Sequence, residues 1–266
     1  MHELVESYAL VRSLRDGSIE QLEFALGSFG RFLGRPATDD DFFDVQVNRY
    51  LLWLASKGYA HETIRARRRM ILTLWRYLHD EGRAPAPRRI RQLGPCYSIP
   101  VALTREQVQA VLDQCGRLVG SFRFHPTIER RTFMLALCRT LYETGFRRSD
   151  ALRIRRPQIQ KPGRIALVRS TTGRPHVARM RPETIALINQ LDLTGRDTVF
   201  GGVMCPRNLG KACSEIFKAA GVPEASMKWL RRSGATHVEM ERPGEGWLYL
   251  GHTTPRLAPI SYLDPH

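Results

Sequence analysis

The chain has 266 residues, of which 42% are hydrophobic, so it can form one large or two ordinary packed domains and is not a disordered polymer. Its formal net charge of +15 indicates a polyanionic partner, nucleic acid first, because Lys and Arg that neutralise phosphates release counterions. No apolar run approaches the roughly 20 residues of a membrane-spanning helix, and the N-terminus lacks the basic-then-apolar order of a signal peptide. We therefore expect no membrane partner.

Amphipathic helices are predicted at 18–33, 42–56 and 61–80. In the third helix one stripe is apolar, and it consists of Ile64, Ile71, Leu74, Trp75 and Leu78. Arginines crowd the remaining surface of this helix. We expect that surface to bind DNA backbone phosphates without reading sequence, through Arg65, Arg67, Arg68 and Arg69.

Residues 82–102 are predicted to be an interdomain linker. Pro85 and Pro87 exclude a helix there, and arginines replace apolar residues. We expect the linker to extend along the polyanion, with Arg88 and Arg89 contacting it. The expected domains are then 1–95, including the first part of the linker, and 103–266.

The second part of the chain predicts more helices around a small antiparallel sheet. Thr104 is a credible N-cap, with Gln107 at the capping-box position, and a strongly apolar helix follows at 131–143. The remaining elements are two strands of a hairpin at 164–169 and 175–180, and helices at 182–191, 207–220 and 228–240. The predicted fold class is mainly α, with a helical N-terminal domain and an α-rich second domain.

Neither the cysteines nor the aspartates predict a metal site. The five cysteines lack Cys-x-x-Cys and zinc-finger spacing, which favours reduced thiols in an intracellular protein. They are Cys96, Cys115, Cys138, Cys205 and Cys213. Asp39, Asp40 and Asp41 stand just before a helix, where aspartates usually act as caps, and no second acidic cluster completes a two-metal site.

Four short segments, in this order along the chain, resemble the motifs of the tyrosine recombinases, or phage-type integrases. Residues 144–152 resemble the family's Thr-Gly-x-Arg-x-Ser-Glu segment. Residues 228–237 are similar to its His-x-Leu-Arg-His segment, and residues 250–253 to its Leu-Gly-His segment. Ser261-Tyr262 would carry the nucleophile, and residues 42–95 resemble the family's helical core-binding domain.

The resemblance implies covalent attack of Tyr262 on a DNA phosphate, which leaves a 3′-phosphotyrosyl link. Arg147, Arg231 and His252 would hold the phosphate, with Lys228 assisting. Arginine suits this role because its planar fork binds two phosphate oxygens and never deprotonates. Since the phosphotyrosine conserves the bond energy, neither a nucleotide nor a metal cofactor is expected.

The general acid that protonates the leaving 5′-oxygen is not fixed by these motifs. Lys228 stands where the family usually has a histidine, and the related type IB topoisomerases have a lysine there. The family's hairpin lysine falls on Thr171 in this chain. Lys228 is therefore the first candidate for the acid and Arg174 the second, because a lysine whose pKa is lowered donates a proton more readily than an arginine.

The expected function is site-specific recombination or integration of double-stranded DNA in a prokaryotic cytoplasm, in association with DNA. By resemblance, the two domains would clamp the duplex, and a homo-tetramer would form on paired sites from a monomer in the absence of DNA. Arg232 joins the expected DNA contacts. Two alternatives stay open: a type IB topoisomerase-like relaxing enzyme, and a catalytically weak DNA-binding protein on the same scaffold.

Overall fold

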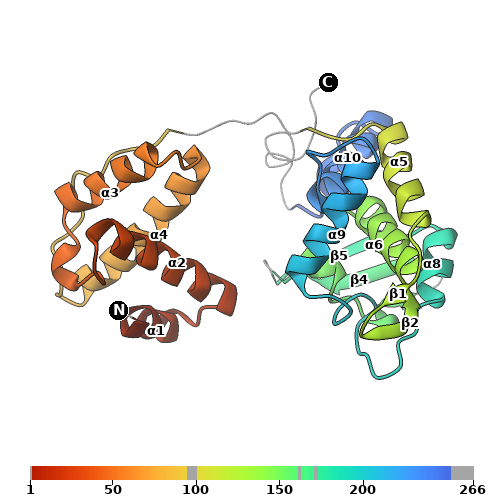
Figure 1. Ribbon diagram of the computed structural model, residues 1–266, viewed down its shortest axis with the longest axis horizontal. Coiled ribbons are helices and arrows are strands. Elements are labelled where there is room, and N and C mark those ends of the chain that lie inside the picture. Colours follow the sequence, from red (N-terminus) through yellow and green to blue (C-terminus); the bar gives the residue numbers. More distant parts are fainter. Residues whose placement is uncertain (1, 95–100, 161–162, 171–172, 253–266) are drawn as a thin grey trace. The chain divides into compact units, whose positions relative to one another are not determined.

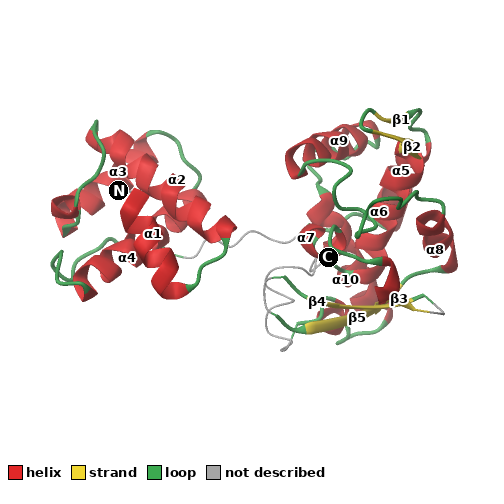
Figure 2. Ribbon diagram, turned by 90° about the horizontal axis from the view of Figure 1, so that it is seen from below, coloured by secondary structure: helices red, strands yellow, loops and turns green. Residues whose placement is uncertain are grey.

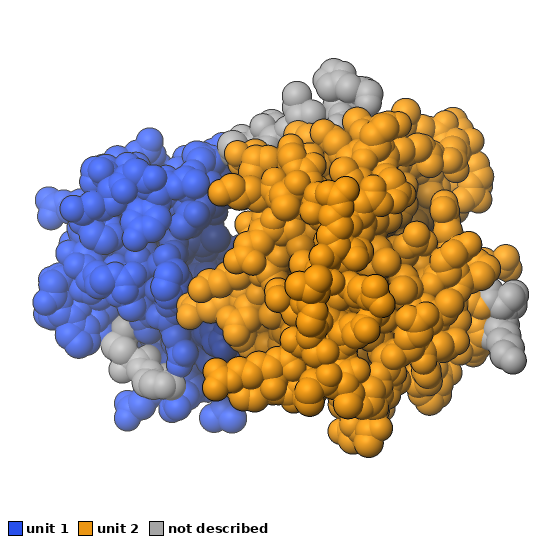
Figure 3. Space-filling view, turned by 45° about the vertical axis from the view of Figure 1, so that its right-hand side comes forward, with its two compact units in different colours: residues 1–97 blue, residues 98–266 orange. Residues whose placement is uncertain are grey.

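The computed structural model describes residues 2–94, 101–160, 163–170 and 173–252 (Figure 1). The chain divides into two compact units, Met1–Tyr97 and Ser98–His266 (Figure 3). The division between residues 97 and 98 lies inside the predicted linker 82–102. Among the described residues, no helix combines the length and the apolar character needed to cross a bilayer.

Over residues 2–94, unit 1 has four α-helices and one short 3-10 helix. They are α1 (His2–Arg12), α2 (Asp16–Leu33), η1 (Asp39–Asp41), α3 (Asp44–Ser56) and α4 (His61–Asp80). The helices predicted at 18–33, 42–56 and 61–80 are confirmed to within two residues at each end. The sequence analysis missed α1, although Leu4, Val5 and Ala9 recur at helical spacing and are all buried.

Aromatic side chains fill the core of unit 1. Phe29, Phe42, Tyr50 and Trp75 are fully buried, and the rings of Phe29 and Tyr50 lie 5.1 Å apart between centroids. The predicted apolar stripe of α4 is buried along its whole length. Such a stripe stabilises a helix mainly by removing its apolar face from water, at about 25 cal/mol per Å².

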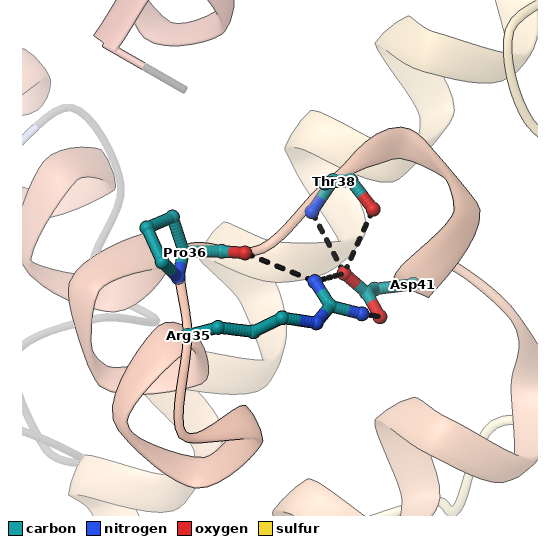
Figure 4. Close-up of polar contacts among 4 residues, drawn as sticks. All are labelled: Arg35, Pro36, Thr38 and Asp41. Carbon is teal, nitrogen blue, oxygen red and sulfur yellow. Dashed lines mark hydrogen bonds and ion pairs between the residues drawn. The ribbon is translucent and has the colours of Figure 1, made fainter.

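Asp41 stabilises the chain reversal that leads into α3 (Figure 4). Its buried carboxylate accepts hydrogen bonds from the backbone N–H of Thr38 at 2.7 Å and from both terminal nitrogens of Arg35 at 2.8 and 2.7 Å. Thr38 is the N-cap of η1 and completes a capping box with Asp41. This agrees with the interpretation of the aspartate run as a cap, and Asp39 forms an ion pair with Arg83 instead.

The first part of the predicted linker packs on unit 1 instead of running free. Asp44 of α3 accepts hydrogen bonds from the backbone N–H groups of Arg88 and Arg89, both at 3.1 Å. Asn48 pairs with the backbone of Arg89 and Arg91 at 2.8 Å. Side chains of α3 thus satisfy backbone groups of the segment 88–91 and hold it on unit 1.

Unit 2 is an α-rich domain with a small sheet (Figure 2). Its helices are α5 (Arg105–Gly116), α6 (Arg130–Thr144), α7 (Arg148–Ala151), η2 (Arg156–Gln158), α8 (Pro182–Asn189), α9 (Pro206–Ala219), α10 (Met227–Glu241) and α11 (Gly246–Tyr249). Its strands are β1 (Ser121–Phe122), β2 (His125–Glu129), β3 (Ile159–Gln160), β4 (Arg164–Val168) and β5 (Pro175–Arg179). The predicted capping box of Thr104 and Gln107 starts α5, and the predicted hairpin is β4–β5 in an antiparallel sheet of order β3-β4-β5.

Helix α6 forms the centre of unit 2, where it packs against α5, α8 and α10. Phe133, Leu137 and Leu141 of α6 are at most 1% exposed. Cys115 and Cys138 belong to the same core with their sulfur atoms 3.8 Å apart, and both are free thiols. A helix buried on nearly all sides positions both of its ends rigidly, and its C-terminal end leads into the candidate site.

Candidate active site

The turn between α6 and α7 places Arg147. Gly145 is the C-cap of α6 with φ of 62°, a left-handed conformation that favours glycine. A Cβ at this position would also lie 2.6 Å from a ring carbon of Tyr249, so no other residue fits without displacement. Phe146 is buried, and Arg147, half-buried, is the N-cap residue of α7. The Thr-Gly-x-Arg pattern thus encodes a tight helix end that turns one arginine out of the core.

Arg231 lies in the second turn of α10 and is 3% exposed. Its guanidinium group donates hydrogen bonds to the carbonyl oxygen of Gly145 and, at 3.3 Å, to that of Leu250. A buried charge needs such partners, because desolvation without them is costly. Arg231 therefore joins three segments that are far apart in the sequence: the end of α6, α10 and the residues after α11.

A cavity of about 470 Å³ opens beside these two arginines. Arg147, Lys228 and Arg231 line it together with Ser214 of α9 and Ser226. Lys228 is exposed in the first turn of α10. With Arg148 and Ser149, four cationic residues and three serines line the cavity, and cationic and hydroxyl groups are the donors typical of an anion site.

His252 is half-buried, and its backbone N–H donates to the carbonyl oxygen of Trp247 at 2.9 Å. Burial, followed by the positive charges of Arg231, Arg169 and Arg147, lowers the pKa of His252 to about 4. The imidazole is consequently neutral near pH 7 and lies within electrostatic reach of three guanidinium groups. The structure thus brings together Arg147, Arg231 and His252.

Arg169, directly after β4, is a site residue that the sequence analysis did not select. It is 4% exposed and donates to the carbonyl oxygens of Leu250 and, at 2.7 Å, Gly251. Arg174, the hairpin residue that we expected as an acid, is exposed. The sequence did contain a signal that Arg169 faces inward. Ile165 and Leu167 face inward along β4, and the two-residue period of a strand puts Arg169 on the same face.

The small residues after Arg231 do not leave room for a ligand. A Cβ on Gly234 would lie 2.1 Å from the phenolic oxygen of Tyr249, so the Tyr249 side chain fills the space beside it. His237 is buried, and its Nδ1 lies 2.8 Å from the phenolic oxygen of Tyr142. Arg232 is half-buried next to Arg231.

The arginine run of α4 does not form one uniform surface. Arg67 is 6% exposed, donates to the carbonyl oxygen of Phe24 at 3.1 Å and stacks over its ring at 4.1 Å. Its expected role in DNA binding is therefore corrected, because the guanidinium is used inside unit 1. Arg69 is exposed, while Arg65 binds Glu62 at 2.6 Å.

Tyr262, the expected nucleophile, and Thr171, which stands at the position of the family's hairpin lysine, lie outside the described residues. The remaining expected DNA contacts are arranged as follows. Arg88 and Arg89 are exposed. Arg68 is half-buried and donates from Nε to the carbonyl oxygen of Arg91 at 2.8 Å.

Comparison with known proteins gives one sequence relative and many structural ones. No family model matches the chain. A tyrosine recombinase XerC of Bradyrhizobium diazoefficiens is 30% identical over 186 residues, which are 64% of this chain and 56% of that protein. A lambda integrase dimer bound to a COC′ core site shares the fold with a TM-score of 0.75 and 13% identity, over 100% of this chain and 96% of that chain.

A lambda integrase tetramer bound to a Holliday junction superposes with a TM-score of 0.71 at 14% identity, covering 97% of this chain and 75% of that chain. Identities this low establish the fold alone. The sequence match adds to this likeness of fold, because that relative is a tyrosine recombinase. The chain thus resembles a tyrosine recombinase in sequence over 186 residues and shares the fold of the lambda integrases.

Proposed function

We propose that this chain is a site-specific DNA recombinase that cuts and rejoins duplex DNA through a 3′-phosphotyrosyl intermediate. The observation that carries the proposal is that Arg147 and Arg231 line one cavity of about 470 Å³ and that both guanidinium groups act electrostatically on His252. The sequence relative is a tyrosine recombinase, of which this chain spans little more than half the length.

The proposed chemistry begins with attack of the Tyr262 phenol on a backbone phosphorus. Negative charge grows on the non-bridging oxygens, and Arg147 and Arg231 stabilise it as fixed cations. Neutral His252 donates one hydrogen bond to the same phosphate. The bond from phosphorus to the 5′-oxygen breaks as the bond to tyrosine forms, and a second 5′-hydroxyl later reverses the step.

Tyr249 packs against Gly145 and Gly234, and it does not suit the role of nucleophile. Its phenol donates a hydrogen bond to the backbone carbonyl oxygen of Tyr142. Burial raises the pKa of this phenol, which disfavours the phenolate. This supports Tyr262 as the attacking group.

Lys228 is the proposed general acid for the leaving 5′-oxygen. It lines the same cavity as Arg147 and Arg231, whereas Arg174 is exposed and has a guanidinium that scarcely deprotonates. Its ammonium group can donate a proton to the leaving oxygen as negative charge appears there.

Duplex DNA is the proposed partner, and a homo-tetramer on two paired sites is the proposed assembly, with a monomer in the absence of DNA. The lambda integrase tetramer on a Holliday junction supports this assembly by its shared fold. The high positive charge supports DNA, and the proposed location is a prokaryotic cytoplasm, since the sequence relative comes from a bacterium.

A trapping experiment tests this function. The full chain is incubated with nicked duplexes whose sequence around the nick is randomised. Cleavage close to the nick releases a short oligonucleotide, so the covalent complex cannot reseal and survives SDS. We expect an adduct in the wild type and in the exposed-tyrosine control Tyr59→Phe, and none in Tyr262→Phe.

Two other results would contradict the proposal. Tight binding without any adduct would identify a DNA-binding protein on a recombinase scaffold. Relaxation of supercoiled plasmids that lack the trapped sequence, at the same rate as plasmids that carry it, would identify a topoisomerase-like enzyme.

A further inference from the structure

We propose that Arg169 is a positioning residue, which fixes the segment Leu250–His252 against the β4–β5 hairpin and so places the imidazole of His252 at the phosphate site. Its guanidinium group donates to two successive carbonyl oxygens of this segment, those of Leu250 and, at 2.7 Å, Gly251. His252 follows directly. A change at Arg169 therefore moves the backbone from which the imidazole extends.

His176 lies on β5, the second strand of the hairpin, and it also contacts this segment. We call Arg169 and His176 together the anchor. Its Nδ1 lies 3.1 Å from Nη2 of Arg169, and its Nε2 lies 3.1 Å from the carbonyl oxygen of Tyr249. A guanidinium can only donate and a carbonyl can only accept, so Nδ1 is the acceptor and Nε2 carries the proton. This single neutral tautomer extends the anchor by one residue, to Tyr249.

Gly251 shows how closely the anchor fits. A Cβ at this position would lie 2.7 Å from Nη2 of Arg169 and 2.8 Å from a ring carbon of His176. Any other residue at 251 must displace one of the two side chains. The glycine of the Leu-Gly-His segment is thus required by the neighbouring hairpin as well as by its own φ of 59°.

The hairpin is anchored on its other side as well. Asp150 of α7 is 2% exposed, and its Oδ1 accepts hydrogen bonds from the backbone N–H of Ser170 at 2.9 Å and from its hydroxyl at 2.7 Å. Adjacent residues of one hairpin therefore contact the segment of His252 and the helix that follows Arg147. Arg169 and Ser170 together set the distance between these two parts of the site.

Arg196 provides a matched control in the same unit. Its guanidinium also donates to backbone carbonyl oxygens, among them those of Val199 and Gly201 at 2.9 Å, within the loop that precedes α9. Replacing Arg196 removes a similar set of hydrogen bonds from a guanidinium group to backbone carbonyl oxygens, but these bonds do not involve residues 250–252. If the role of Arg169 were purely structural, replacing Arg169 and replacing Arg196 should have the same effect on His252 and on adduct formation.

The first test needs no DNA: the imidazole of His252 is titrated by NMR in the free, full-length protein. In Arg169→Met we expect the pKa of His252 to rise by roughly half a unit or more, since a neighbouring positive charge is lost and the segment is released. Arg169→Lys, which keeps the charge and one donor, should stay closer to the wild type. Arg196→Met should leave the titration unchanged.

The second test rests on the proposed function and uses the trapping substrate. We expect Arg169→Met to slow adduct formation by about 100-fold, the order of effect of a 1 Å misplacement, with partial rescue in Arg169→Lys. Gly251→Ala, which keeps Arg169, should show the same defect. If Arg169→Met fails to fold, Gly251→Ala and Arg169→Lys carry the test.

Equal titration curves and equal rates in the Arg169 variants and Arg196→Met would overturn the positioning role. Absence of any adduct in the wild type, with the shifted titration still present, would instead overturn the proposed function and leave the anchor in place.

Discussion

Arg169 and Arg231 donate hydrogen bonds to the same acceptor, the carbonyl oxygen of Leu250. One arginine comes from the hairpin and the other from α10. The residues just before His252 are thus held from two sides by guanidinium groups. In this site Arg231 therefore lines the cavity and also holds the backbone next to it.

Arg147 and Arg231 should differ when each is replaced by lysine. Both variants lose the bidentate fork, and we expect adduct formation to fall by about 100- to 1,000-fold in each. Arg231 is buried and donates to backbone carbonyls, whereas Arg147 is half-buried at the cavity. Arg231→Lys should therefore also lower the free energy of unfolding by on the order of 2 kcal/mol. Denaturant unfolding checks this, and an equal loss of stability in both variants would contradict it.

Lys228→Met should slow cleavage of ordinary DNA by about 100-fold or more, the usual contribution of a general acid. A substrate with sulfur in place of the bridging 5′-oxygen has a leaving group that needs no proton. Adduct formation by Lys228→Met should recover on this substrate, while that of Arg231→Lys should not. Failure of Lys228→Met to recover would assign the lysine to phosphate binding instead.

His176 should make unit 2 sensitive to acid. Burial, followed by the charges of Arg169 and Arg231, lowers its pKa to about 4. Since the unfolded imidazole takes up a proton near pH 6.5, stability is present above that pH and is lost as the pH falls toward 4, by up to about 3 kcal/mol. In His176→Gln the fall in the free energy of unfolding between pH 7 and 4 should be smaller. An unchanged pH dependence would contradict the buried neutral imidazole.

Arg67 and Arg69 lie close together on α4 and should have separable effects. Arg69→Ala should reduce the slope of log K for DNA binding against log salt concentration by about 1, as expected for one lost phosphate contact. Arg67→Ala should leave this slope unchanged and lower the melting temperature, since its guanidinium packs on Phe24. Binding titrations at several salt concentrations, with thermal unfolding of each variant, make the comparison. A reduced slope in Arg67→Ala would contradict the burial of this arginine.

Periodicity and end signals allowed most helices of both units to be predicted, because α4 and α6 each bury a regular apolar face. Helix α1 was missed because its few apolar residues give a weak pattern. The sequence did not distinguish buried Arg67 from the other arginines of α4, because Phe24 comes beside it only in the fold. The motif residues Arg147, Arg231 and His252 could be selected from the sequence. For Arg169 the period of β4 indicated only that the side chain faces inward, because its partners, Leu250 and Gly251, follow it by about eighty residues.

The most direct measurement is mass spectrometry of the peptide that remains attached to DNA after trapping and proteolysis. The account predicts one nucleotide-bearing residue, Tyr262, linked to a 3′-phosphate, and no such peptide from Tyr262→Phe. DNA attached to any other side chain, or an adduct that persists in Tyr262→Phe, would contradict it.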